Sequence, residues 1–253
     1  MTQQTAPERP PGTCPGSDGP LAVPRHPFVR GALLAAAAAT GCLIVVDLGI
    51  RTFHEYVAAV PALRLIFNVG TEGNLATWWN TALLLSVAGT ALVAAALSGR
   101  TARPGRRSWL GLALAAAWLS IDESAQVHER LAGPGNDWAR EHGITLPTYA
   151  WILPGSLLAV AGTVCAVLWA RRLPPDVRRG LLGALAAYFS GALAVEAFNG
   201  WAKRQGADAV YALGTSVEEG LEMGACLMVL ATLAKVVLLV QDPISDRLIV
   251  RLR

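Results

Sequence analysis

The sequence predicts an all-α protein, a polytopic bundle of about six transmembrane helices with both termini in the cytoplasm. Of the 253 residues, 53% are hydrophobic and 15% are charged, whereas soluble domains usually carry about 25% charged residues. Several apolar runs approach or exceed the roughly 20 residues that a helix needs to cross a bilayer. The Lys and Arg residues gather in alternate loops, which is the pattern that orients membrane proteins.

The chain divides into a tail, a membrane domain and a second, short tail. Residues 1–29 are rich in Pro, Gly and polar residues without periodicity, so we expect a disordered cytoplasmic tail. The transmembrane domain covers 30–240, and 241–253 form the short cytoplasmic tail. The spans are placed at about 30–50, 75–98, 108–129, 149–170, 179–201 and 216–240, with Pro154 in the first turns of the fourth.

Orientation follows from the basic residues. Most of the 21 Lys and Arg residues lie before the first span, between the second and third, between the fourth and fifth, or after the sixth. These segments are therefore expected in the cytoplasm, and the loops 51–74, 130–148 and 202–215 outside. The Ala- and Arg-heavy composition is typical of a high-GC bacterium, so we expect a multi-pass protein of the bacterial inner membrane. The lipid bilayer is its expected partner, and nucleic acid is not.

Five of the six predicted spans bring polar side chains to the level of the outer leaflet, and the fourth does not. At a helical rise of about 1.5 Å per residue, Asp122 lies roughly 20 Å along the third span and His128 roughly 30 Å. Ionisable groups in a span usually face the bundle interior and mark function. The other polar groups at this level are Asp47, Arg51, Glu72, Asn74, Asn80, Glu123, Glu196, Asn199, Glu218, Glu219 and Glu222.

The third span ends in "SIDESAQVHER", and its carboxylates lie where they oppose the helix dipole. On a continuing helix, Asp122, Gln126 and Glu129 would share one face, with Ser124 and His128 on the face beside it. The alternative is that His128, Glu129 and Arg130 already lie in water at the interface, and this explains Asp122 and Glu123 less well because they lie deeper. The stretch therefore indicates a functional site.

Some of these polar groups also have structural interpretations, which the sequence leaves open. Ser216 and Glu219 form a capping-box pattern at the start of the sixth span, but Glu222 lies beyond the first turn. The other structural alternatives are an Asp47–Arg51 ion pair, a Glu196–Lys203 ion pair and a helix–helix hydrogen bond from Asn80.

Carboxylates and a histidine from several helices are typical ligands of Zn, Fe or Mn. We therefore expect a divalent metal ion, one of these three, in the outer leaflet. Its expected ligands are Asp122, His128, Glu196 and Glu222. Glu123 or Glu219 would be the catalytic group, acting as a general base toward a metal-bound water. The four cysteines form no CxxC pair, so they indicate neither a disulfide framework nor a thiolate metal site.

The segments "EGNLATWWNTALLL", "LSIDESAQVHERL" and "VEEGLEMG" together resemble an uncharacterised family of bacterial multi-pass membrane proteins, with a DE-x4-HE motif and a downstream EE-x2-E motif. The resemblance covers most of the membrane region, and it implies the architecture but no activity. The stretch "ATWWNT" is also similar to the alkaline ceramidases, which are membrane hydrolases that hold zinc through histidines. The His-x-x-x-His pair of that group is absent from this sequence.

Three functions are compatible with these observations. The first is a metal-dependent membrane enzyme, a hydrolase or oxidoreductase, acting on a lipid or a periplasmic small molecule. The second is a proton- or cation-coupled transporter, which would need polar groups through the inner leaflet, where the sequence offers few. The third is a non-catalytic assembly subunit in which the polar layer joins the helices.

Overall fold

The computed structural model describes residues 26–99, 104–241 and 248–252, and these are mostly helical, as predicted. Most of the predicted tail over 1–29 lies outside the described residues. The elements are α1 (Pro27–Tyr56), α2 (Pro61–Phe67), α3 (Leu75–Leu97), α4 (Arg106–Ala125), a 3-10 turn (Glu129–Leu131), α5 (Ala132–Glu141), α6 (Ile152–Ala170), α7 (Pro175–Phe189), a π-helical segment (Ser190–Val195), α8 (Glu196–Arg204), α9 (Asp208–Leu233), β1 (Val237–Gln241) and β2 (Leu248–Leu252).

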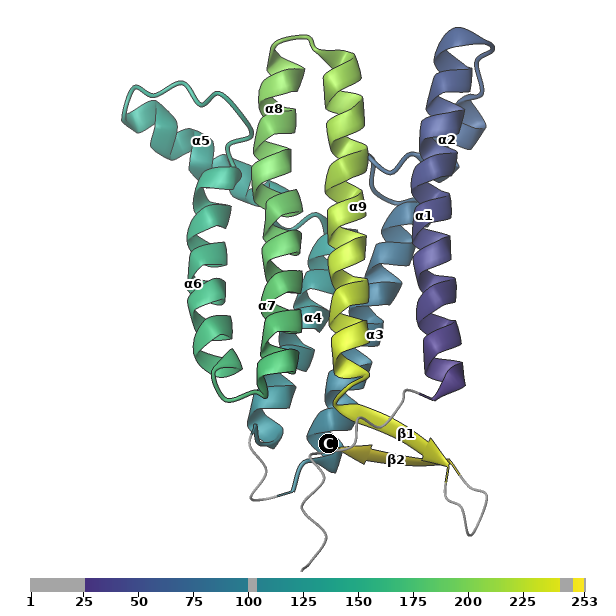
Figure 1. The fold of residues 1–253 in the computed structure, drawn as a ribbon. Helices are drawn as coiled ribbons and strands as arrows, with labels where there is room; N and C mark the ends of the chain where they lie inside the picture. Colours follow the sequence, from purple (N-terminus) through teal and green to yellow (C-terminus); the bar gives the residue numbers. More distant parts are fainter. Residues whose placement is uncertain (1–25, 100–103, 242–247, 253) are drawn as a thin grey trace, which may run out of the picture.

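Four helical segments are long and apolar enough to cross a membrane. They are α1, α3, α6 and the continuous segment Pro175–Arg204, which contains α7, the π-helical segment and α8. The helices α4 and α9 run alongside them in one bundle, while α5 projects sideways at one end (Figure 1). Both α4 and α9 carry acidic side chains as well as apolar ones.

The bundle is held together by close packing of small residues around a few large ones. α3 contributes a buried row of alanines that includes Ala88, Ala91 and Ala95, and α4 packs along it. Trp109 of α4 is 1% exposed and meets the ring of Trp169 edge to face, at 5.7 Å between ring centres. Small residues let helix backbones approach closely, which favours association within a membrane.

Local sequence explains where most helices begin and end. Asn74 caps α3, since its side-chain oxygen accepts from the backbone amides of Ala76 and Thr77. Proline in the first turn starts α1, α2 and α7, where its missing amide hydrogen costs nothing. Pro154 also falls in the first turn of α6, as expected.

Two predicted boundaries are wrong. The sixth span was expected to run from 216 to 240, but α9 begins at Asp208 and ends at Leu233. Ser216 and Glu219 are therefore interior residues of α9, so they form no capping box. Beyond α9 the chain forms a hairpin in which β1 pairs antiparallel with β2, with Val237 opposite Leu252. The hairpin takes up part of the predicted tail over 241–253.

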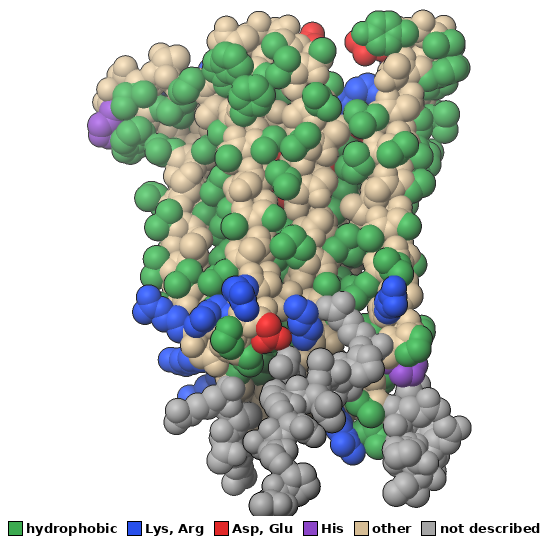
Figure 2. All heavy atoms as spheres, in the orientation of Figure 1, with side chains coloured by type: hydrophobic (Ala, Val, Ile, Leu, Met, Phe, Trp, Pro, Cys, Tyr) green, Lys and Arg blue, Asp and Glu red, His purple; other side chains and the backbone are tan. Residues whose placement is uncertain are grey.

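One end of the bundle is strongly basic, and we call it the basic end. It carries the start of α1 and the C-terminal hairpin, so both ends of the described chain lie there (Figure 1). In Figure 2 the Lys and Arg side chains gather in a band at this end, below a largely apolar surface. The opposite end, where α4 ends and α6 begins, we call the outer end.

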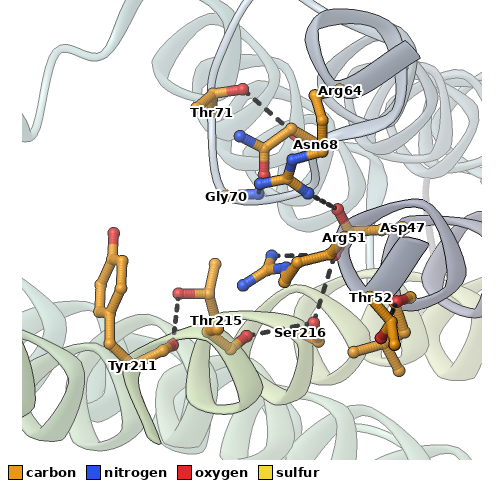
Figure 3. A network of polar contacts seen from close by, with 12 residues as sticks. Asp47, Arg51, Thr52, Arg64, Asn68, Gly70, Thr71, Tyr211, Thr215 and Ser216 are labelled. Atoms are coloured by element: carbon orange, nitrogen blue, oxygen red, sulfur yellow. Dashed lines mark hydrogen bonds and ion pairs between the residues drawn. The ribbon is translucent and has the colours of Figure 1, made fainter. Parts of the chain in front are cut away.

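Asp47 ties three helices together near the outer end (Figure 3). Its carboxylate is 0% exposed and accepts from Arg51 of α1 and Arg64 of α2, each at 3.0 Å. The hydroxyl of Ser216, on α9, lies 3.4 Å from the same carboxylate. The Asp47–Arg51 pair that the sequence left open is thus confirmed, and Arg64 adds a second cation from outside α1.

Candidate functional site

A cavity of about 1190 Å³ lies inside the bundle, between α3, α4, α6, α7–α8 and α9. Toward the basic end its wall is apolar, with Leu112, Ala116 and Leu181 among the side chains. Toward the outer end the wall is acidic. Its acidic residues are Glu72, Asp122, Glu123, Glu129, Glu196, Glu218, Glu219 and Glu222. The cavity therefore has an apolar part, which we call the apolar compartment, and an acidic part.

Asp122 and His128 form a hydrogen-bonded pair on the cavity wall. α4 ends at Ala125 because Gln126 adopts a left-handed conformation, with φ 52° and ψ 44°. The turn brings the His128 backbone amide to Asp122 Oδ1, to which it donates at 2.7 Å, and the ring Nδ1 within 3.0 Å of Oδ2. The predicted helical face through Asp122, Gln126 and Glu129 is therefore wrong beyond residue 125.

The Asp122 carboxylate holds His128 in one orientation. With Nδ1–H donating to Asp122, the other ring nitrogen, Nε2, has no hydrogen-bond partner among the described residues. Burial of the imidazole opposes its charge, but the hydrogen bond and the negative charge of Asp122 outweigh it, so the pKa of His128 is raised above its ordinary value. A carboxylate–imidazole pair of this kind is a general acid–base unit.

Trp151 connects His128 with Glu196. Its ring meets the His128 ring at 4.7 Å between centres, and its Nε1–H donates to Glu196 Oε1 at 3.0 Å. The predicted Glu196–Lys203 ion pair is not among the ion pairs of the described residues. The ammonium of Lys203 lies instead over the rings of Tyr149 and Tyr211, at 6.0 Å and 5.3 Å from their centres.

Glu218 is held by α8. Asn199 donates from Nδ2 to Glu218 Oε2 at 2.7 Å, while its own Oδ1 has no partner among the described residues, although Asn199 is only 1% exposed. The close approach depends on Gly214, where a β-carbon would lie 1.9 Å from Asn199 Oδ1. Glu218 was noticed in the sequence as part of the acidic layer, but its partner could not be foreseen from local spacing.

Glu222 lies deepest among the predicted ligands. It is 8% exposed and lines the cavity, and no hydrogen bond or ion pair to it is found among the described residues. Its charge acts on those of Glu219 and Glu123, so the two predicted catalytic carboxylates are its neighbours. Gly191 of the π-helical segment faces it, and a β-carbon there would come within 3.2 Å of Glu222 Cγ.

The predicted metal site is not supported. Asp122, His128, Glu196 and Glu222 do line one cavity. Within the described ranges, however, no three His, Cys, Asp or Glu side chains gather closely enough to hold a metal ion. The physical reason is that two of the expected ligands already have partners, since Asp122 is hydrogen-bonded to His128 and Glu196 accepts from Trp151.

Sequence reasoning missed Trp151 and Tyr211 as parts of the site, and it offered Glu196 as the partner of Lys203. The fourth span was set aside because it carries no ionisable side chain at the outer level, yet its start supplies the indole that bridges His128 and Glu196. A tryptophan at the start of an apolar run is usually an interfacial anchor. Only the tertiary structure distinguishes Trp151 from such an anchor, because it shows the contacts of Trp151 with His128 and Glu196.

Comparison with known proteins places the chain in a family but assigns no activity. Neither the curated proteins nor the solved structures contain a match. A family model described as "Domain of unknown function (DUF8692)" matches residues 30–236, which is most of the chain and nearly all of the predicted membrane domain. The sequence-based expectation of an uncharacterised family is thereby confirmed, and the protein belongs to the DUF8692 family.

Proposed function

We propose that the protein is a membrane enzyme that takes an amphiphilic molecule into its cavity and acts on the polar head. The observation that carries this proposal is the cavity of about 1190 Å³, whose wall includes both the Asp122–His128 pair and an apolar compartment. Ligand cavities for drug-sized molecules measure about 300–1,000 Å³. The space thus suits a molecule with a substantial hydrocarbon part.

The Asp122–His128 pair supplies acid–base chemistry for hydrolysis of the head. His128 Nε2 takes a proton from water as the water oxygen bonds to an electrophilic carbon or phosphorus, and it returns the proton to the leaving group. Asp122 keeps the imidazole in the required tautomer and stabilises its charged form. The predicted Zn, Fe or Mn ion stays a prediction, which metal analysis of gently extracted protein tests.

The proposal includes the finer topology. α4 and α9 would be the two further spans, giving six, with the basic end and both termini in the cytoplasm of a bacterium and the acidic wall in the outer leaflet. The band of Lys and Arg at the basic end supports this orientation. The apolar lining toward the basic end disfavours the transporter alternative, because an ion pathway needs polar groups along its length.

Two matched variants on α6 test occupancy of the cavity. Ala166 lines the cavity, whereas Ala161 is exposed on the same helix and is not part of the wall. Ala166→Trp fills the apolar compartment, so co-purifying lipid measured by native mass spectrometry is expected to fall. Ala161→Trp should leave it unchanged. Equal lipid retention in both variants contradicts the proposal.

Activity is tested on lipid extracts. Wild-type protein in vesicles of bacterial lipid is expected to convert at least one species, detected by liquid chromatography and mass spectrometry. His128→Gln should abolish the conversion, while Glu141→Gln, on the exposed end of α5, should retain it. A conversion that persists in His128→Gln rules out the assigned acid–base role.

A further inference from the structure

The cavity wall has far more acidic than basic side chains. Eight acidic residues line it, against three basic ones, His128, Lys203 and Arg204. Each of the three already has a partner: His128 contacts Asp122, Lys203 lies over two tyrosine rings, and Arg204 donates to the Thr148 carbonyl at 3.1 Å. The protein itself therefore leaves most of these carboxylates without a cation.

Glu222 is the clearest case. It is 8% exposed, its remaining exposure faces the cavity, and the part of the chain that is described gives it no hydrogen-bonding or ionic partner. A buried carboxylate without a partner is costly, and it is stabilised by a proton or by a cation that donates hydrogen bonds.

The apolar compartment fits an organic cation better than a bare inorganic one. Leu112, Ala116, Leu181 and Leu185 line it and offer no ligand atoms, and the described carboxylates form no three-membered ligand group. An ammonium group requires less convergence of the carboxylates than a metal ion does, because its N–H···O hydrogen bonds measure about 2.7–2.9 Å, whereas Zn–O bonds measure about 2.0–2.2 Å.

We propose that the occupant is a cationic amphiphile whose ammonium group lies against Glu218, Glu219 and Glu222 and whose hydrocarbon chain fills the apolar compartment. This inference rests on the proposed function and names its substrate class. A head with an ammonium group placed there would lie beside Glu196 and Trp151, and so near the free nitrogen of His128.

The test uses three amphiphiles with the same alkyl chain and different heads: a primary ammonium, a sulfate and an uncharged sugar. Binding to wild-type protein in nanodiscs of zwitterionic lipid is measured by native mass spectrometry. The ammonium compound is expected to bind about tenfold more tightly than the uncharged one, and the sulfate more weakly. Glu222→Gln should lose most of this preference, whereas Glu141→Gln, outside the cavity, should keep it.

The uncharged amphiphile reports whether a variant is folded, since it binds through the apolar compartment alone. If Glu222→Gln loses that binding as well, Glu218→Gln takes its place in the same comparison. Equal or tighter binding of the sulfate by wild type overturns the inference but leaves the proposed function standing. An unchanged preference for the ammonium compound in a folded carboxylate variant also overturns the inference and leaves the proposed function standing. If none of the three compounds binds, both the inference and the proposed function fail.

Discussion

Buried carboxylates in this protein are of two kinds. Asp47 is 0% exposed and has two guanidinium groups and a hydroxyl around it, so its charge is compensated within the protein. Glu222 is nearly as buried, and it has no such partner among the described residues. The first arrangement fits a structural joint, and the second fits a site that awaits a ligand or a proton. The sequence showed both as acidic residues near the ends of spans.

Asp47→Asn should destabilise the protein by about 2 kcal/mol. Removing one member of a buried ion pair costs about 3–5 kcal/mol, and the loss is smaller here because Arg51 and Arg64 are 17% and 23% exposed and can be hydrated. Thermal unfolding in detergent measures the effect. Asp137→Asn removes an exposed pair with Arg140 and should change the stability little. Equal effects of the two variants would contradict the structural role of Asp47.

Asp122→Asn should lower the pKa of His128, as measured by NMR of the imidazole protons. The pKa of His128 is raised in the folded protein, so its protonated form contributes stability that is fully present below about 6.5, its unfolded value. That contribution disappears as the pH rises through the folded pKa. The loss of melting temperature in Asp122→Asn should therefore shrink as the pH increases. A pH-independent loss would show that the pair does not act through its charge.

At the scale of elements, the end of one helix and a π-helical segment in another position the side chains of the site. The left-handed Gln126 turns the chain so that His128 reaches back to Asp122. The π-helical segment (Ser190–Val195) has a similar effect on α8. Tyr188, Ala192 and Glu196 all line the cavity at spacings of four, although eight residues of a regular α-helix turn about 80° past two full turns. The wider π turn keeps Glu196 on the cavity side.

Gly214→Ala tests the contact between α8 and α9. A β-carbon at this position would lie 1.9 Å from Asn199 Oδ1, so Asn199 must move and its hydrogen bond to Glu218 is expected to break. We expect a loss of stability of about 2 kcal/mol, in the range of other overpacked contacts. Gly220→Ala is the control on the same helix, since nothing lies within 4 Å of its added β-carbon. An unchanged stability of Gly214→Ala would show that α8 and α9 are loosely packed.

At the scale of the whole molecule, charge is segregated along the bundle axis. The described chain ends lie at the basic end (Figure 1), together with a band of Lys and Arg side chains (Figure 2). The carboxylates line the cavity nearer the outer end. Under the proposed topology, the acidic part of the cavity would lie at the level of the outer leaflet and its apolar compartment at the middle of the membrane. An amphiphile oriented by the bilayer already has its head and chain at these two levels.

Labelling with a membrane-impermeant maleimide tests this orientation in intact cells. In a variant without native cysteines, Glu141→Cys at the exposed end of α5, at the outer end, should be labelled. Gly105→Cys, immediately before α4 at the basic end, should be labelled only after the cells are opened. The reverse pattern would invert the proposed topology.

The sequence by itself predicted the helical class, the apolar segments long enough to cross a membrane, and the separation of basic from acidic side chains along the bundle axis. These follow from composition, apolar length and the spacing of charges, which are local quantities. Tertiary structure alone decided which carboxylates gain partners: Arg64 and Ser216 reach Asp47, Trp151 reaches Glu196, and Asn199 reaches Glu218. Such contacts join residues far apart in the chain. They depend on helix ends and packing angles that no local spacing encodes.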